Sequence, residues 1–195
     1  MNFLAHIYLS GEDEDLMIGN FIADAIRGKQ IENYSPAVQR GIRLHRKIDA
    51  YTDSHAVVAE SKDRLRADHG KYAPVIVDVF YDHFLAANWQ KYHDQELQTF
   101  IKQVHKTLRR NFRILPQRVQ GFLPFMIAHK WLAGYARLEG VRASLKGLSR
   151  RSRFDPQMDR SVDLLHREYE AFGDDFARFF PDLRNYVRET IKNET

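Results

Sequence analysis

The amino-acid sequence predicts an all-α fold of about seven or eight helices in one domain, residues 1–195. Residues typical of helix starts and stops recur along the chain, and apolar residues repeat at helical spacing. We find no alternating strand pattern, no hairpin dipeptide and no internal repeat. A length of 195 residues with 44% hydrophobic residues suits one domain with a sizeable core.

Local signals mark the helices expected in the N-terminal half. Ser35 is an N-cap residue, and Pro36 after it occupies the first helical position. Gly70 is typical of a helix end. The expected segments are residues 1–6, 16–28, 36–53, 56–69 and a long run that opens at Pro74.

The C-terminal half shows the same kind of signals. A glycine- and serine-containing stretch, residues 140–153, is expected to end in a mobile connection. The expected segments are a helix capped by Asp94, a run from Pro116 to about Gly140, and a last segment that starts at Asp155-Pro156 and breaks near Gly173 and Pro181.

Composition excludes several classes of protein and site. The chain has no cysteine, so a metal ion would have to be held by nitrogen and oxygen ligands. The N-terminus lacks the basic region and cleavage site of a signal peptide, and no stretch reaches the roughly 20 apolar residues of a membrane span. We therefore expect a cytoplasmic protein.

Positive charge is unevenly distributed. The net charge is +4, and basic residues cluster at 109–113 and 146–153. Such clusters suggest an acidic partner: nucleic acid, an acidic protein or a phosphate-bearing ligand. A solvated basic face without a partner is the equally weighted alternative.

The segment GIRLHRKIDAYTDSH, residues 41–55, places polar side chains on an apolar helix face. On a helical wheel of about 100° per residue, His45 and Asp49 fall between apolar neighbours. Asp53 falls at the edge of that face, where we expect a contact with Arg46. The pattern predicts a buried imidazole and carboxylate one turn apart.

The run after Pro74 is apolar nearly all round, which predicts a buried helix. It nevertheless carries Asp78 and Asp82, four residues apart, and His83, which points about 100° away from Asp82. Carboxylates in such surroundings need a cation, which could be arginine, protonated histidine or a metal ion. A buried ion-pair network with an arginine is the alternative.

Two further segments repeat the four-residue spacing, with Asn2 and His6 in one and Asn20 and Asp24 in the other. Each residue has an ordinary interpretation: a satisfied histidine, a hydrogen-bonding amide, an ion pair of Asp24 with Arg27. Together, four helical segments could supply the nitrogen and oxygen ligands of a metal site in a helical bundle.

The motifs MNFLAH, GNFIADAIRG, GIRLHRKIDAYTD and DVFYDHFL resemble, in order and spacing, those of the acyl carrier protein phosphodiesterases. The resemblance covers nearly the whole chain. It implies an HD-domain-like, manganese-dependent enzyme that removes 4′-phosphopantetheine from holo acyl carrier protein and leaves the apo protein. The order Asp82-His83 departs from the usual His-Asp dipeptide of the HD superfamily.

The resemblance also implies roles for individual residues. The expected metal ligands are Asp24, His45, Asp82 and His83, for Mn²⁺ or, failing that, Mg²⁺, Fe²⁺ or Zn²⁺. Three catalytic roles are expected: Asp49 orients His45, Asp78 acts as a base on the attacking water or orients neighbours of Asp82, and His6 delivers a proton to the leaving serine oxygen.

The implied partner is holo acyl carrier protein, an acidic protein that would suit the basic clusters, rather than nucleic acid or a membrane. Two other functions remain open on the residues alone. One is a metal phosphohydrolase acting on a nucleotide or another small phosphoester. The other is a non-catalytic helical module that binds an acidic protein.

Overall fold

A computed structural model describes residues 1–152 and 156–194, and within them it confirms the all-α prediction. These residues form eleven α-helices and six short 3₁₀ helices, and none forms a β-strand. The α-helices are α1 (Phe3–Leu9), α2 (Glu14–Ile22), α3 (Pro36–Ser54), α4 (Ala56–His69), α5 (Ala73–Ala87), α6 (Leu97–Arg110), α7 (Gln117–Ala128), α8 (Trp131–Gly134), α9 (Leu138–Arg151), α10 (Ser161–Arg167) and α11 (Tyr169–Asn193).

The expected helix boundaries around α3 and α4 are confirmed. The Ser35 hydroxyl accepts a hydrogen bond from the backbone N–H of Val38, and Pro36 begins α3. Helix α4 ends before Gly70, whose φ of 47° lies in the left-handed region that favours glycine. Helix α2 is shorter than expected, since it ends at Ile22 and a 3₁₀ turn, Ala23–Ala25, carries the chain onward.

Asp94 does not cap a helix, so that expectation is wrong. Helix α6 begins three residues later, after Glu96. Two side chains hold the preceding segment as a turn, because the Trp89 indole donates to the backbone oxygen of Gln95 and His93 Nδ1 accepts from the Gln95 N–H.

The C-terminal half departs further from the expected segments. The run expected from Pro116 to Gly140 is divided where Lys130 adopts a φ of 53°, and helix continues through the basic stretch as α9 to Arg151. This division raises the helix count above the expected number. The expected start at Asp155 lies outside the described residues.

Helix α11 is continuous through Gly173 and Pro181, contrary to the expected breaks. A Cβ atom at position 173 would lie 3.2 Å from the Phe84 ring, so glycine allows α11 to approach α5 closely. Phe176 and Phe180, which lie between these positions, are buried. Tertiary packing of an apolar face thus outweighs the local preference of glycine and proline for ending a helix.

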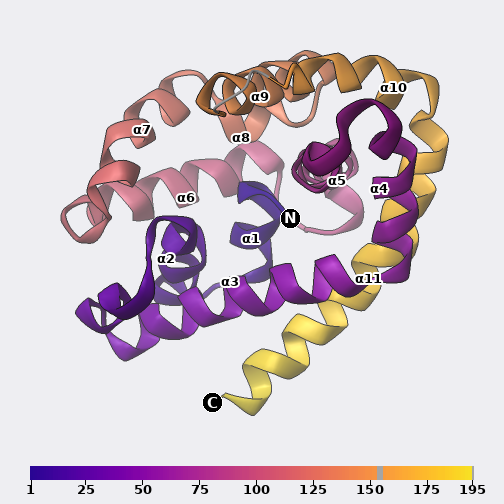
Figure 1. Cartoon of the computed structure of the whole chain (residues 1–195). Coiled ribbons are helices and arrows are strands. Elements are labelled where there is room, and N and C mark those ends of the chain that lie inside the picture. The colour runs from indigo at the N-terminus through magenta and orange to yellow at the C-terminus, as the bar shows by residue number, and fades with distance from the viewer. Residues whose placement is uncertain (153–155, 195) are drawn as a thin grey trace.

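Helix α1 lies in the interior of the molecule, near the centre of Figure 1, with α3 running below it and α6 to α9 above it. Helices α2 and α3 pack unusually closely, because Gly19 and Gly41 face each other. A Cβ atom at Gly19 would lie 2.0 Å from the Val38 carbonyl oxygen, and one at Gly41 would lie 2.2 Å from that of Leu16. This contact brings the end of α2 against the middle of α3.

Helix α5 is buried on nearly all sides, as the sequence predicts. Its aromatic side chains pack against α11, for example Phe80 against Phe172, with ring centroids 5.2 Å apart. No helix in the described part of the chain is both long enough and apolar enough to cross a membrane.

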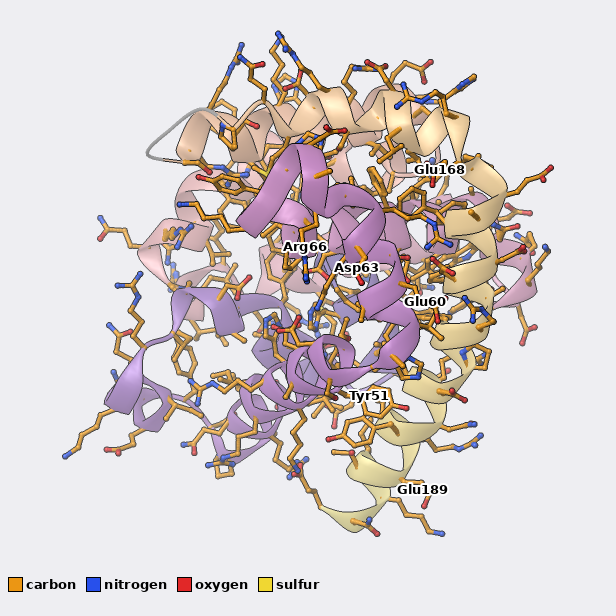
Figure 2. The ribbon with its side chains drawn as sticks, turned by 45° about the vertical axis from the view of Figure 1, so that its right-hand side comes forward. Tyr51, Glu60, Asp63, Arg66, Glu168 and Glu189 are labelled. Atoms are coloured by element: carbon orange, nitrogen blue, oxygen red, sulfur yellow. The ribbon has the colours of Figure 1, made fainter. Side chains whose placement is uncertain are left out.

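An ion-pair network joins α4 to α11. Buried Asp175 accepts hydrogen bonds from Arg64 and Arg178, at 2.7 and 2.6 Å. Arg178 also pairs with Glu60, and Arg64 lies 3.5 Å from Glu168; Figure 2 labels both glutamates along the seam between the two helices. The network fixes α11 against α4.

Candidate metal centre

Asp82 of α5 positions helix α1. Its carboxylate is fully buried and accepts two backbone N–H bonds, from Leu4 at 2.8 Å and from Ala5 at 3.1 Å. Burial raises the pKa of Asp82 to about 7, although the two N–H bonds act in the opposite direction. Both oxygens of this expected metal ligand are therefore engaged in holding the N-terminal end of α1.

His6 of α1 has a tautomer that its neighbours determine. The Asn20 amide group donates to the His6 carbonyl oxygen and to Ser10 Oγ, so Asn20 Oδ1 faces His6 Nδ1, at 2.8 Å, as an acceptor. His6 Nδ1 must then carry the hydrogen. His6 Nε2 faces two more acceptors, the Asp49 carboxylate and the Met1 carbonyl oxygen, each at 3.1 Å.

His45 of α3 is held in the same way. Its Nδ1 lies 2.8 Å from the backbone oxygen of Asn20 and donates to it. Its Nε2 lies 3.1 Å from the second Asp49 oxygen and 3.3 Å from Asp24. The two imidazoles therefore direct their Nε2 atoms at opposite oxygens of one carboxylate.

The local electrostatics differ between the two rings. Burial, and then the neighbouring His45, lower the pKa of His6 to about 4, so His6 is neutral near pH 7. For His45, burial acts downward, but hydrogen bonds to Asp24 and Asp49 outweigh it and raise the pKa to about 9. The same contacts hold the pKa of both carboxyls below the usual range, in Asp49 against burial.

These contacts leave three electron-rich atoms facing one another around His6 Nε2. The neutral ring has no hydrogen there, yet an Asp49 oxygen and the Met1 carbonyl oxygen both point at it. A cation between these atoms would relieve the repulsion. Ligand atoms of His6, His45 and Asp49 lie within 4.8 Å of one another, so the group has the donor types and the spacing of a metal site.

The rim of this cluster is acidic and partly open to solvent. Asp24, in the turn after α2, exposes 76% of its side chain, and Asp49 exposes 40%. Asp78 of α5 accepts a 2.8 Å hydrogen bond from the Met1 ammonium group, which lies 3.7 Å from Asp49. Burial raises the pKa of Asp78, partly offset by this ammonium group.

The structure brings five of the seven expected site residues to this cluster or its rim: His6, Asp24, His45, Asp49 and Asp78. Asp82 instead bonds to the N-terminal end of α1, and His83 contacts two tyrosines. His83 Nδ1 is 2.7 Å from the Tyr135 carbonyl oxygen, and Nε2 is 2.9 Å from the Tyr169 hydroxyl. Both ring nitrogens of His83 thus have partners that do not belong to the cluster.

Asp53 and the basic clusters also have defined neighbours. Asp53 pairs with Lys62 at 2.8 Å, so the expected contact with Arg46 is replaced by one with α4. In the first basic cluster, Arg110 pairs with Glu14. In the second, Lys146 and Arg150 are exposed on α9.

Some parts of the site give no signal in the sequence. Asn20 contributes a backbone oxygen, and Met1 contributes a carbonyl oxygen and an ammonium group, none of which depends on the identity of a side chain. The place of His6 in the cluster did have a signal, namely its four-residue spacing from Asn2 on an apolar segment.

Comparison with known proteins gives one consistent result. The family model described as acyl carrier protein phosphodiesterase matches residues 1–183. A protein of that name from Shigella boydii is 35% identical over 185 residues, which cover 94% of this chain and 95% of the relative. One from Photorhabdus laumondii is 31% identical over 195 residues, 100% of this chain and 96% of the relative.

No solved structure matches the chain, so the expected likeness to HD domains stays a prediction. The family model spans the segments that carry His6, Asn20, Asp24, His45 and Asp49, and the relatives align over nearly their full length. The chain belongs to the acyl carrier protein phosphodiesterase family.

Proposed function

We propose that this chain is a metal-dependent phosphodiesterase that hydrolyses holo acyl carrier protein to the apo protein and 4′-phosphopantetheine. Membership of the family supports the substrate. One observation carries the metal dependence: His6 and His45 direct Nε2 at the two oxygens of Asp49, while both Nδ1 atoms donate to Asn20. Ligating histidines in metal enzymes are commonly oriented by such hydrogen bonds on the other ring nitrogen.

The proposed ligands are His6, His45 and Asp49, with Asp24 at the open side. The sequence-based expectation included Asp82 and His83, and here His6 and Asp49 take their place. Asp82 and His83 are left out because they hydrogen-bond to other residues. A bound divalent ion would lower the pKa of a coordinated water and withdraw charge from a phosphoryl oxygen. Mn²⁺ is the proposed ion, with Mg²⁺, Fe²⁺ and Zn²⁺ as alternatives of suitable ligand chemistry.

The remaining polar groups have separate tasks in this proposal. Asp78 is the carboxyl best suited to take a proton from the attacking water, because its pKa is raised and it lies at the rim beside Asp49. His6 is better suited to ligation than to protonating the leaving serine oxygen, since its low pKa keeps it neutral near pH 7 and its one N–H donates to Asn20. Asp82 keeps α1, and with it His6, in place.

The decisive experiment incubates the protein with holo acyl carrier protein and Mn²⁺ and follows the carrier by intact mass spectrometry, with a chelator in a parallel sample. We expect loss of the prosthetic group only when metal is present. An unchanged carrier mass with added Mn²⁺ would overturn the proposed substrate. Release at the same rate in the chelated sample would overturn the metal dependence.

Two controls sharpen this test. His45→Ala should remove activity, whereas His166→Ala, an exposed histidine on α10, should retain it. A panel of nucleotides offered under the same conditions tests the small-phosphoester alternative, because cleavage of nucleotides without cleavage of the carrier would favour that alternative.

A further inference from the structure

A small cavity of about 130 Å³ lies between the N-terminal segment, α8 and α9. Phe3, Trp131 and Tyr135 supply aromatic walls, and Asn2 and Arg151 supply polar groups. None of the residues that line the cavity has a role in the proposed reaction. Its small volume and its lining suit a small, mostly apolar group with a few polar atoms.

Small residues keep the cavity open along α9. A Cβ atom at Gly140 would lie 2.0 Å from the Gly134 carbonyl oxygen, so these two glycines allow α8 and α9 to touch. Gly147, two turns further along α9, has a different surrounding: a Cβ there would meet only the tip of the Arg151 side chain, at 4.0 Å. A larger side chain at position 147 would therefore fill cavity space without displacing the backbone.

The cavity adjoins the candidate metal centre through the first residues of the chain. Asn2 and Phe3 line the cavity, and Met1, directly before them, contacts His6 through its carbonyl oxygen and Asp49 through its ammonium group. Consecutive Cα atoms are about 3.8 Å apart, so Met1, which contacts the cluster, directly adjoins Asn2, which lines the cavity.

Positive charge lies along α9, the helix that forms one side of the cavity. Arg151 lines it, and Lys146 and Arg150 are exposed on the same helix. An acidic protein docked on α9 would thus lie beside this cavity.

Resting on the proposed function, we propose that this cavity binds the pantoyl part of the 4′-phosphopantetheine arm. In that arm, a quaternary carbon with two methyl groups follows the phosphate-bearing CH₂, which makes the pantoyl part compact and apolar. A cavity of roughly 150 Å³ holds a group the size of benzene, so one of about 130 Å³ suits this part of the arm and not its whole length. The amide-containing remainder then runs outward past Arg151.

The test measures binding of free pantetheine, which carries no phosphate and needs no metal. Trp131 lines the cavity, so pantetheine should cause a saturable change in tryptophan fluorescence that Trp131→Phe abolishes. Gly147→Leu should weaken binding at least about tenfold, since the leucine side chain occupies the cavity. Gly121→Leu is the matched control: position 121 lies exposed on α7 with nothing within 4 Å, and binding should be unchanged.

A truncated compound, β-alanyl-cysteamine, identifies the part of the arm that binds, because it lacks the pantoyl group. It should give no fluorescence change at concentrations that saturate with pantetheine. An equal response to both compounds, or equal pantetheine binding by the wild type and Gly147→Leu, would overturn the proposal. So would the absence of any pantetheine response in the wild-type protein.

These results are distinguishable from those that test the proposed function. If the enzyme removes the prosthetic group but pantetheine does not bind in the cavity, the cavity assignment fails and the reaction stands. If pantetheine binds as expected while holo carrier protein stays intact, the cavity assignment stands and the proposed function fails.

Discussion

The imidazole rings of His6 and His45 stack with their centroids 3.9 Å apart and their planes 16° from parallel. Burial, and then repulsion from His45, lower the pKa of His6 to about 4. Burial acts downward on His45 as well, but its hydrogen bonds to Asp24 and Asp49 raise its pKa to about 9. Asn20 bonds to both Nδ1 atoms, through its side-chain and backbone oxygens. One residue of α2 thus orients both rings.

Replacing the Asn20 side chain should weaken metal binding without removing a ligand. Asn20→Leu has a similar volume but cannot accept the hydrogen bond from His6 Nδ1. Loss of such an orienting partner typically costs about 10- to 100-fold in metal affinity. Titration of the metal-free protein with Mn²⁺ by isothermal calorimetry measures the effect.

Asn111→Leu is a suitable control for this change. Asn111 follows α6 and donates to the Thr107 carbonyl oxygen, away from the cluster. It should leave Mn²⁺ affinity unchanged. Equal affinities for the wild type and Asn20→Leu would show that the hydrogen bond does not orient a ligand.

Two histidine variants distinguish the structure-based ligand set from the sequence-based one. His45→Ala should lose most of its bound metal, because His45 Nε2 faces Asp24 and Asp49. His83→Ala should retain metal, since both of its ring nitrogens contact tyrosines. Elemental analysis of the purified proteins after dialysis with Mn²⁺ gives the metal content, and depletion in His83→Ala would restore that residue as a candidate ligand.

The sequence predicts the helical class and most of the cluster because both depend on periodicity. Four-residue spacing places His45 and Asp49 on one face and brings His6 and Asn20 into consideration. Periodicity does not show which of two adjacent side chains faces the site. It therefore could not decide whether Asp82 or His83 is a metal ligand. Their surroundings depend on where α1 and α8 pack, and that packing is a tertiary property.

The same limit applies to the C-terminal half. Pro181 has the local signal of a helix break, yet α11 continues through it because Phe180 and Leu183 are buried on either side. The Lys130 backbone, which does divide a helix, has no such signal, as lysine ordinarily favours helix.

Asp82 should contribute to stability through helix α1. Asp82→Ala would leave the buried N–H groups of Leu4 and Ala5 without acceptors, and each such group costs about 1–3 kcal/mol. We therefore expect the free energy of unfolding to fall by roughly 2–6 kcal/mol in urea titrations at pH 8. Asp82→Asn keeps one acceptor oxygen and should lose less; equal losses in the two variants would argue against a role through the N–H groups.

His83 should make stability sensitive to acid. Burial lowers its pKa below the usual 6.5, against the hydrogen bond with Tyr135, so the unfolded chain binds more protons than the folded one as pH falls below 6.5. The contribution of this group to stability is therefore present above pH 6.5 and is lost as the pH falls below it. His83→Gln, which does not titrate, should show a smaller difference in unfolding free energy between pH 7.5 and pH 5 than the wild type does. A difference as large as in the wild type would assign the acid sensitivity to other groups.

The exposed basic residues of α9 should govern encounter with an acidic carrier protein. Lys146→Glu with Arg150→Glu replaces two positive charges by two negative ones beside the cavity, and we expect a rise in KM for holo carrier protein of roughly tenfold or more at low salt. The difference from the wild type should shrink above about 0.5 M salt, where screening removes most attraction between exposed charges. Arg188→Glu with Lys192→Glu makes the same charge change near the end of α11 and serves as the control. If both double variants raise KM equally, net charge and not the α9 surface determines the encounter.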